Sequence, residues 1–156
     1  KPRLLAATLG LGLLAGCQAQ PLYGSMSGQN QSVTISAADS RVEQIVRNEL
    51  VLGFGGEQKN GAYQLDLTVT AGVAGLLPGG LDNELSAART TVTASYVLKS
   101  ASTGETVKEG SRFVDAQLDL PSQNFAQERA KLEAEDRAAR QVAALVRADI
   151  ATALAR

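Results

Sequence analysis

An alternating stretch in the middle of the chain constrains the fold more than any other feature. From residue 63 to residue 73, tyrosine, leucine, valine or alanine occupies every second position, and glutamine, aspartate, threonine or glycine lies between them. Successive side chains of a β-strand point to opposite faces, so this stretch predicts a strand with one buried and one solvated face. A sheet with one apolar face needs a covering layer.

The rest of the chain predicts three more strands and two helices. Residues 32–36, 88–99 and 106–116 read as strands, and the last two form an antiparallel hairpin around residues 100–105. Asp39 or Ser40 caps a first helix, and Ser40-x-x-Glu43 matches a capping box; a longer helix spans about residues 124–155. The predicted order is β-α-β-β-β-α. This order predicts an α+β two-layer sandwich with both helices on one face of a mixed four-stranded sheet.

The first residues have the pattern of a secretory signal. A basic start at residues 1–3 and an apolar run at residues 4–14 lead into Leu14-Ala15-Gly16-Cys17. The run has about 11 residues, whereas a bilayer span needs about 20. The final motif resembles the bacterial lipobox, whose cysteine is lipidated and becomes the new N-terminus. The alternatives are an ordinary signal peptide or a buried helix with a chance cysteine.

We therefore expect a lipoprotein signal peptide at residues 1–16 and a lipidated flexible tether at residues 17–31, followed by a single domain at residues 32–156. A covalent diacylglycerol and an acyl chain on Cys17 would anchor the protein to a membrane. One predicted loop in the domain, residues 75–80, is unusually apolar, because Leu76, Leu77 and Leu81 lie in or beside it. These leucines either pack onto the domain or contact a lipid or a partner protein.

Composition excludes several classes of function. The sequence has no histidine, which excludes histidine-dependent catalysis and histidine-ligated zinc. Its 15 basic residues become 13 without Lys1 and Arg3, against 16 acidic ones, so no global positive charge attracts nucleic acid. Two of the three residues Asp66, Asp115 and Asp119 could form a carboxylate pair, but solvated strand and loop positions explain these aspartates better. We expect no enzymatic activity, no metal and no cofactor beyond the lipid.

A series of short motifs runs along most of the chain after the signal peptide. The lipobox is followed by Pro21-Leu22-Tyr23-Gly24, with Gln18-Ala19 between them. The later motifs are Arg41-Val42, Arg47-Asn48-Glu49-Leu50, Tyr63-x-Leu65, Tyr96-x-Leu98 before Thr103-Gly104, Phe125-Ala126, Arg129-Ala130 and Ala134-Glu135-x-Arg137-Ala138-Ala139. In order and spacing they resemble the LPS-assembly lipoprotein family LptE, in its alphaproteobacterial form. That family commonly has Gly-Phe where this chain has Gln18-Ala19.

The resemblance implies a non-enzymatic component of lipopolysaccharide transport. LptE-like proteins lie at the inner leaflet of the outer membrane, plug a large β-barrel partner, LptD, and help deliver lipopolysaccharide to the cell surface. We therefore expect a lipid-anchored protein on the periplasmic face of the outer membrane, with Thr68 and Thr93 on a surface that faces the polar barrel lumen. Another periplasmic lipoprotein, such as an auxiliary subunit of a lipid transporter or a pilot of a secretion channel, is the alternative.

The predicted hairpin also offers a candidate lipopolysaccharide-binding surface. If Lys99 faces Thr106, then Lys99, Lys108 and Arg112 share the face that the helices leave open, and Phe113 faces the helices. Lysine and arginine bind phosphate groups, such as those of lipid A, through charge-assisted hydrogen bonds. The alternative is a solvated face that protects a sheet edge from aggregation. A register slip of one residue would scatter the three cations over both faces.

Overall fold

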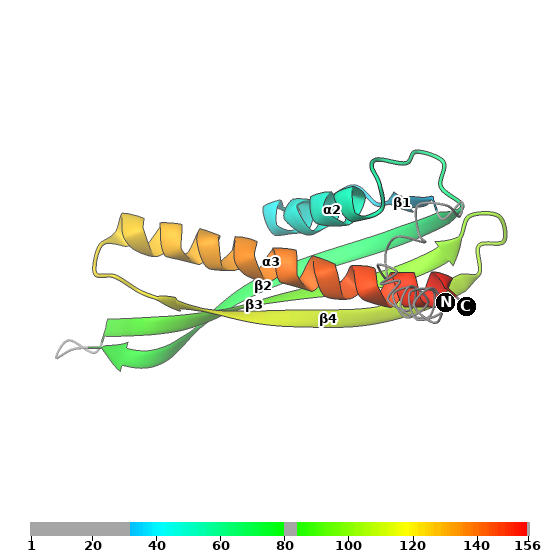
Figure 1. Ribbon diagram of the computed structural model, residues 1–156. Coiled ribbons are helices and arrows are strands. Elements are labelled where there is room, and N and C mark those ends of the chain that lie inside the picture. The colour runs from blue at the N-terminus through cyan, green and yellow to red at the C-terminus, as the bar shows by residue number, and fades with distance from the viewer. Residues whose placement is uncertain (1–31, 80–83, 156) are drawn as a thin grey trace, which may run out of the picture.

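The computed structural model describes residues 32–79 and 84–155 of the 156-residue chain. The elements follow one another as shown in Figure 1. They are β1 (Val33–Ile35), α2 (Arg41–Gly53), β2 (Tyr63–Gly79), β3 (Glu84–Ser100), β4 (Thr106–Asp119) and α3 (Asn124–Leu154). The order β-α-β-β-β-α and the α+β class are those that the sequence predicts.

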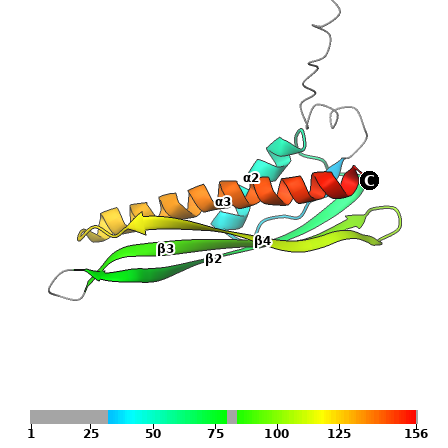
Figure 2. The same ribbon diagram turned by 60° about the horizontal axis from the view of Figure 1, so that its bottom comes forward.

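The four strands form one mixed sheet in the order β1-β2-β3-β4. β1 is parallel to β2, whereas β2, β3 and β4 are antiparallel to their neighbours. β2 and β3 each have 17 residues, and β4 has 14, which is long beside the roughly 5–6 residues of a common strand. The result is an elongated, twisted sheet, and both helices lie on the same face of it (Figures 1 and 2).

Local sequence signals explain where α2 begins and ends. Ser40 is the N-cap residue, and its hydroxyl accepts a hydrogen bond of 3.2 Å from the backbone N–H of Glu43, as the capping box predicts. The helix ends at Gly53, beside the side chain of Arg147 from α3. Val42, Val46 and Leu50 are buried on its inner face.

α3 packs on the sheet largely through alanine. Its buried residues are Ala134, Ala138, Ala139, Val142, Ala143, Val146 and Ile150. Small side chains allow the helix to approach the strands closely, and the sheet supplies the larger core residues Leu65, Leu98 and Val92. Leu145 of α3 is 44 % exposed, because it lies to one side of this buried face.

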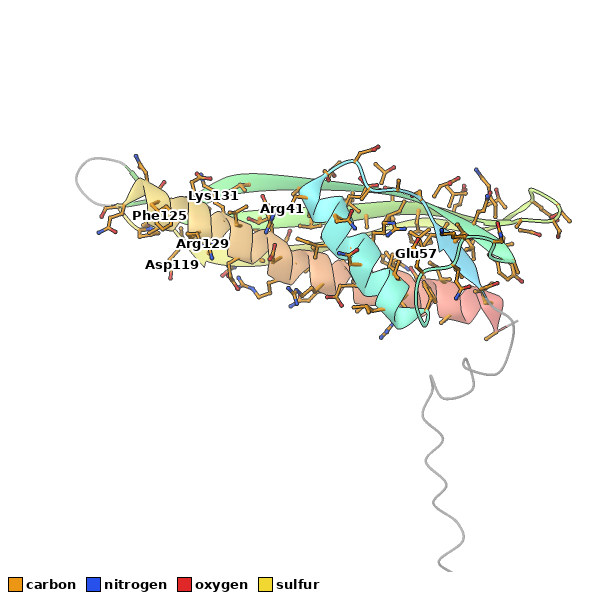
Figure 3. The ribbon with its side chains drawn as sticks, turned by 90° about the horizontal axis from the view of Figure 1, so that it is seen from above. Arg41, Glu57, Asp119, Phe125, Arg129 and Lys131 are labelled. Atoms are coloured by element: carbon orange, nitrogen blue, oxygen red, sulfur yellow. The ribbon has the colours of Figure 1, made fainter. Side chains whose placement is uncertain are left out.

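Charged side chains join the two helices where they lie side by side (Figure 3). Arg41, at the start of α2, contacts Glu135 at 3.3 Å and also pairs with Asp136, both on α3. About one turn further along α3, Arg140 lies 3.8 Å from Glu49. These pairs are partly exposed, so each contributes little to stability.

The sheet continues past the predicted end of β2. Residues 75–79, predicted as part of a loop, belong to β2, because pairing with residues 84–88 of β3 overrides the glycine and proline signals. Ala71 and Val73 share a face with buried Leu67 and Val69 but are exposed, since α2 covers only the half of β2 next to β1 (Figure 1). Leu76 is exposed too. We call residues 71–79 and 84–88 the distal arm. Leu81 lies outside the described residues, and only the backbone of Leu77 is described.

Candidate functional site

The proposed lipidation site lies outside the described residues. Cys17, the signal peptide at residues 1–16 and the tether at residues 17–31 all precede Ser32, where the description begins. They stay predictions from the sequence. Across residues 32–79 and 84–155, no helix is both long and apolar enough to cross a membrane.

The register of the β3–β4 hairpin departs from the prediction after its first pair. Lys99 lies opposite Thr106, as expected, but an irregularity follows, and Leu98 lies opposite Lys108. Val107 is therefore an extra residue in β4, as in a β-bulge. Because side chains alternate with a period of two, every later residue of β4 points to the face opposite to the predicted one.

The bulge separates the three candidate cations. Lys99 lies on the uncovered face, where its ammonium group is 2.8 Å from a carboxylate oxygen of Asp66. Lys108 lies opposite the buried Leu98 and thus on the helix side, and Arg112, four residues further along β4, shares that side. The predicted common face of Lys99, Lys108 and Arg112 is therefore wrong, and a shared phosphate site has no geometric basis.

Arg112 instead belongs to a polar cluster between the sheet and α3. The hydroxyl of Tyr96 donates a hydrogen bond of 2.7 Å to Asp149 of α3, and the guanidinium of Arg112 contacts the same carboxylate at 2.8 and 2.9 Å. Tyr96 is 2 % exposed. Its hydroxyl lies beside Gly110, where an added Cβ would be 2.7 Å from the phenol oxygen. The cluster joins β3, β4 and α3, and it requires a small residue at position 110.

The pKa values of the cluster show that it does not titrate near neutral pH. Burial, followed by the hydrogen bond to Asp149, raises the pKa of Tyr96 to about 12. Burial alone would raise the pKa of Asp149, but the hydrogen bonds from Tyr96 and Arg112 and the charge of Lys108 outweigh it and hold that pKa below its usual value. The phenol thus remains a donor and the carboxylate an acceptor. This arrangement suits a structural contact between layers rather than proton transfer.

The face of the sheet without helices is polar and rich in hydroxyl groups, and we call it the open face. It is made by alternate residues of β2, β3 and β4. These include Gln64, Asp66, Thr68, Thr70, Arg89, Thr91, Thr93, Ser95, Val97, Lys99, Glu109, Ser111, Phe113, Asp115 and Gln117. Thr68 is exposed and Thr93 partly exposed, as expected. Phe113, predicted to face the helices, lies here and is 66 % exposed.

Asp66 and Asp115, both on the open face, lie too far apart to form a carboxylate pair. Asp66 and Asp115 lie opposite Val97 and Thr91, six residues apart along β3, which corresponds to roughly 20 Å. Asp115 accepts a hydrogen bond of 2.6 Å from the hydroxyl of Thr91, and Asp66 is paired with Lys99. Among the described residues, no group of three or more side chains is arranged to hold a metal ion.

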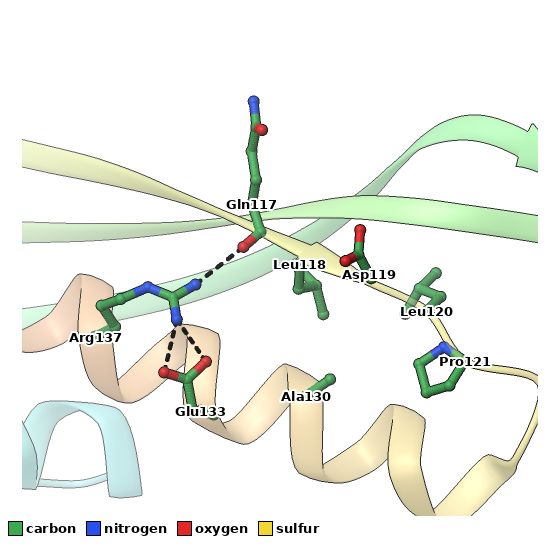
Figure 4. A pocket seen from close by; sticks show the side chains of 8 residues that line it. All are labelled: Gln117, Leu118, Asp119, Leu120, Pro121, Ala130, Glu133 and Arg137. Carbon is green, nitrogen blue, oxygen red and sulfur yellow. Dashed lines mark hydrogen bonds and ion pairs between the residues drawn. The ribbon is translucent and has the colours of Figure 1, made fainter.

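Two grooves lie on either side of the first turns of α3. The first, of about 520 Å³, lies between this helix and the end of β4, where the Glu133–Arg137 ion pair borders it (Figure 4). The second, of about 590 Å³, opens toward the distal arm and is lined by Val73 and Lys131 among others. Phe125, at the start of α3, is 79 % exposed (Figure 3). The distal end therefore presents apolar side chains that the domain does not cover.

These features define a class of protein: a small two-layer α+β domain with a long hairpin sheet, an open polar face and an apolar distal end. Solved structures share this architecture. The chain is similar to a protein of Caulobacter crescentus CB15 described as a candidate lipoprotein, with a TM-score of 0.68 and 25 % sequence identity. That similarity covers 86 % of this chain and 98 % of the Caulobacter chain.

Two further lipoproteins have the same fold at lower sequence identity. Rare lipoprotein B from Shewanella oneidensis has a TM-score of 0.58 and 13 % identity over 78 % of this chain and 92 % of its own. A minor lipoprotein from Acinetobacter baumannii has a TM-score of 0.57 and 14 % identity over 80 % of this chain and 92 % of its own. No protein-family model and no curated protein matches the sequence. The fold is thus one found among bacterial lipoproteins, in agreement with the predicted lipobox.

Sequence reasoning missed the Tyr96–Asp149–Arg112 cluster. Tyr96 lies on the same face of β3 as the buried residues Ala94 and Leu98, and a buried phenol hydroxyl needs a hydrogen-bond partner. The sequence does contain a signal for such a contact. A tyrosine among the buried positions of a strand needs a hydrogen-bond partner, and the covering helix can supply one. The partner itself, Asp149, follows only from the helix–sheet packing.

Proposed function

We propose that this chain is a lipoprotein of the outer membrane that, with a large β-barrel partner of the LptD type, assembles lipopolysaccharide at the cell surface. The observation that carries the proposal is the open face. A sheet of three long strands leaves an entire polar face uncovered, although the opposite face is packed by two helices. In this proposal the open face lies against the polar inner wall of the barrel.

The charges of the open face support a polar, uncharged contact. Lys99 is paired with Asp66, and Arg89 lies 3.7 Å from Asp115. Most of the charge on the open face is therefore balanced within the domain. The remaining surface presents mainly threonine and serine hydroxyl groups, which both donate and accept hydrogen bonds. Such a face suits a wet, polar interface better than an apolar membrane surface.

The shape of the domain also supports the proposal. The tether would join at Ser32 beside β1, and the distal arm lies at the opposite end (Figure 1). β2 runs from Tyr63 to Gly79, which at about 3.3 Å per residue is roughly 53 Å. A bilayer with its headgroups is about 40–45 Å thick. A domain held by a lipid at the inner leaflet is thus long enough to extend through a barrel. The structural relatives add that lipoproteins use this fold.

The proposal assigns the chain no catalytic role and no cofactor besides the lipid on Cys17, and it leaves out the shared phosphate site of Lys99, Lys108 and Arg112. Its test is site-specific photo-crosslinking in intact cells. Probes at Thr68 and Thr93 should both capture one large barrel protein, more strongly than a probe at Gln141, which is exposed on the helix layer. Depletion of that barrel should remove both crosslinks.

The identity of the crosslinked protein also distinguishes the proposed function from the alternative. Capture of an inner-membrane transporter subunit or a secretion channel by the same probes would favour an auxiliary subunit or a pilot lipoprotein. Silence of both probes, with the protein folded and present in the membrane fraction, would contradict the use of the open face as a barrel contact.

A further inference from the structure

The two edges of the sheet differ in how well they are protected against pairing with another strand. β4, one edge, carries charged side chains, the bulge at Val107 and two arginines that occupy outward backbone carbonyls. Arg112 donates a hydrogen bond of 3.1 Å to the carbonyl of Ser111, and Arg137 donates one of 2.9 Å to the carbonyl of Gln117. Charges, bulges and occupied edge groups are the devices by which proteins prevent another strand from pairing. The β4 edge is therefore protected.

β2 has a free edge over most of its length. β1 pairs only with Tyr63, Gln64 and Leu65, and the hydroxyl of Ser36 extends this cover by accepting a hydrogen bond of 3.0 Å from the N–H of Leu67. Along the covered part, the backbone groups that point to β1 belong to odd-numbered residues, since the N–H of Tyr63 bonds to Ser32 and the carbonyl of Leu65 accepts from Ser36. The even-numbered residues bond to β3.

This alternation continues to Gly75, because the register with β3 is regular that far. The N–H and C=O groups of Val69, Ala71, Val73 and Gly75 therefore point away from β3. Within residues 32–79 and 84–155, no hydrogen bond from outside the β2–β3 ladder reaches them. The free edge runs from residue 69 to residue 75, which is about 20 Å. One end of the free edge is the hydrogen bond from the N–H of Leu67 to Ser36, and the other end is the register irregularity after Gly75.

The free edge lacks every device that protects β4. No charged residue occurs between Asp66 and the end of β2 at Gly79. Residues 70–76 are all exposed, and Val73 is 45 % exposed. A long, uncharged and uncovered edge with unpaired backbone groups is a template for strand addition.

We propose that residues 69–75 of β2 accept a β-strand from another protein, which extends the sheet at this edge. The faces beside the edge define the strand that fits. Val69, Ala71 and Val73 lie on the helix side, and Thr70 with Gly72 lies on the open face, so the partner strand alternates apolar and small polar residues and carries no charge over about seven residues. Strand addition at this edge does not require the partner to be a β-barrel protein.

The edge is poorly suited to a second copy of this chain. A symmetric antiparallel pair centred on Ala71 sets Gly75 opposite Leu67, whose N–H is already bound by Ser36. A pair centred on Val73 leaves only residues 71–75 in regular register, because the irregularity follows Gly75. A separate strand without these constraints pairs with the whole free edge.

Ala71→Pro tests the proposal without breaking the sheet. Proline removes the N–H of residue 71, which faces the free edge, and leaves the hydrogen bonds between β2 and β3 in place; proline is tolerated in edge strands in this orientation. Ala71→Val is the matched control, since it keeps the N–H. A photo-crosslinker at Val73 in the full-length chain, used in membranes, reports the contact, and mass spectrometry identifies the crosslinked peptide.

We expect the Val73 probe to crosslink one uncharged, alternating segment of another protein. Ala71→Pro should lower the crosslink yield at least about fivefold, which is the effect of one lost hydrogen bond, and Ala71→Val should leave the yield within about twofold. Both variants should unfold at nearly the parental temperature. In the purified complex, the amides of Ala71 and Val73 should exchange with solvent as slowly as that of Gly72; in the free protein they should exchange faster.

Several results would overturn the proposal. They are crosslinks to a second copy, crosslinks to residues 17–31 of the same chain, an equal yield from folded Ala71→Pro, and fast exchange of the Ala71 and Val73 amides in the complex. A crosslinked alternating strand from a protein that is not a barrel would support strand addition and contradict the proposed function, so the two proposals fail independently.

Discussion

Replacing Tyr96 by phenylalanine removes one hydroxyl group from the contact between the sheet and α3. The hydroxyl is buried and donates a hydrogen bond of 2.7 Å to the carboxylate of Asp149. Hydrogen bonds to charged groups contribute about 1.5–3 kcal/mol. Asp149 keeps its contact with Arg112 in the variant and is partly exposed, so the loss falls at the lower end. We expect Tyr96→Phe to lower the free energy of unfolding by about 1.5 kcal/mol.

Urea unfolding of a soluble form, followed by far-ultraviolet circular dichroism, measures this change. Tyr63→Phe is the matched control, because Tyr63 is half-buried and no described residue forms a hydrogen bond with its hydroxyl; we expect a change below about 0.5 kcal/mol there. In a double-mutant cycle, most of the effect of Tyr96→Phe should vanish in an Asp149→Asn background. A loss equal to that of the control would refute the role assigned to the cluster.

The same cluster predicts how stability depends on pH. The pKa of Tyr96 is raised to about 12 in the folded protein, so its contribution is complete below pH 10 and is lost as pH rises toward 12. That loss is on the order of 2 kcal/mol, and Tyr96→Phe should lack it. The pKa of Asp149 is lowered, so its contribution is present above about pH 4 and is lost as pH falls further. An alkaline decline of equal size in the parent and in Tyr96→Phe would contradict this assignment.

Three further substitutions test separate parts of the account. Cys17→Ser should lose the acyl mass and move from the membrane fraction to the soluble periplasmic fraction, since each buried CH₂ of the lipid contributes about 0.8 kcal/mol; retention in membranes without a barrel partner would mean another anchor. Thr90→Val should leave the free energy of unfolding unchanged or raise it by about 1 kcal/mol, because the buried hydroxyl has no hydrogen-bond partner among the described residues; a clear loss in urea unfolding would reveal one. Gly110→Ala should lower that free energy by about 1–3 kcal/mol through contact with Tyr96. Gly72→Ala is its control, because a Cβ at residue 72 has no described neighbour within 4 Å; similar effects of the two substitutions would refute the close contact.

The elements with strong local signals could be predicted from the sequence. The alternation at residues 63–73 identified β2 and its buried face, because that pattern depends only on the geometry of one strand. The capping interaction of Ser40 with Glu43 located the start of α2 for the same reason. The arrangement of helices on one face followed because an apolar sheet face has to be covered.

The register of the hairpin and the extent of the distal arm could not be predicted in this way. A bulge at Val107 depends on how the turn and both strands fit together, and one extra residue moved Phe113 to the open face and Arg112 to the helix side. The candidate phosphate site failed for that reason alone. Likewise, glycine and proline near residue 78 signalled a loop, but the pairing with β3 extended the strand to Gly79.

The proposed contact between the open face and a barrel can be tested by affinity purification of the full-length chain from detergent-solubilised membranes. We expect one very large outer-membrane β-barrel protein in near-equimolar amount, and we expect its loss when Thr68→Arg and Thr93→Arg together disrupt the open face. A matched Gln141→Arg variant on the helix layer should retain the barrel. Recovery of the folded chain from membranes without a barrel protein, or with an inner-membrane transporter in its place, would contradict the account.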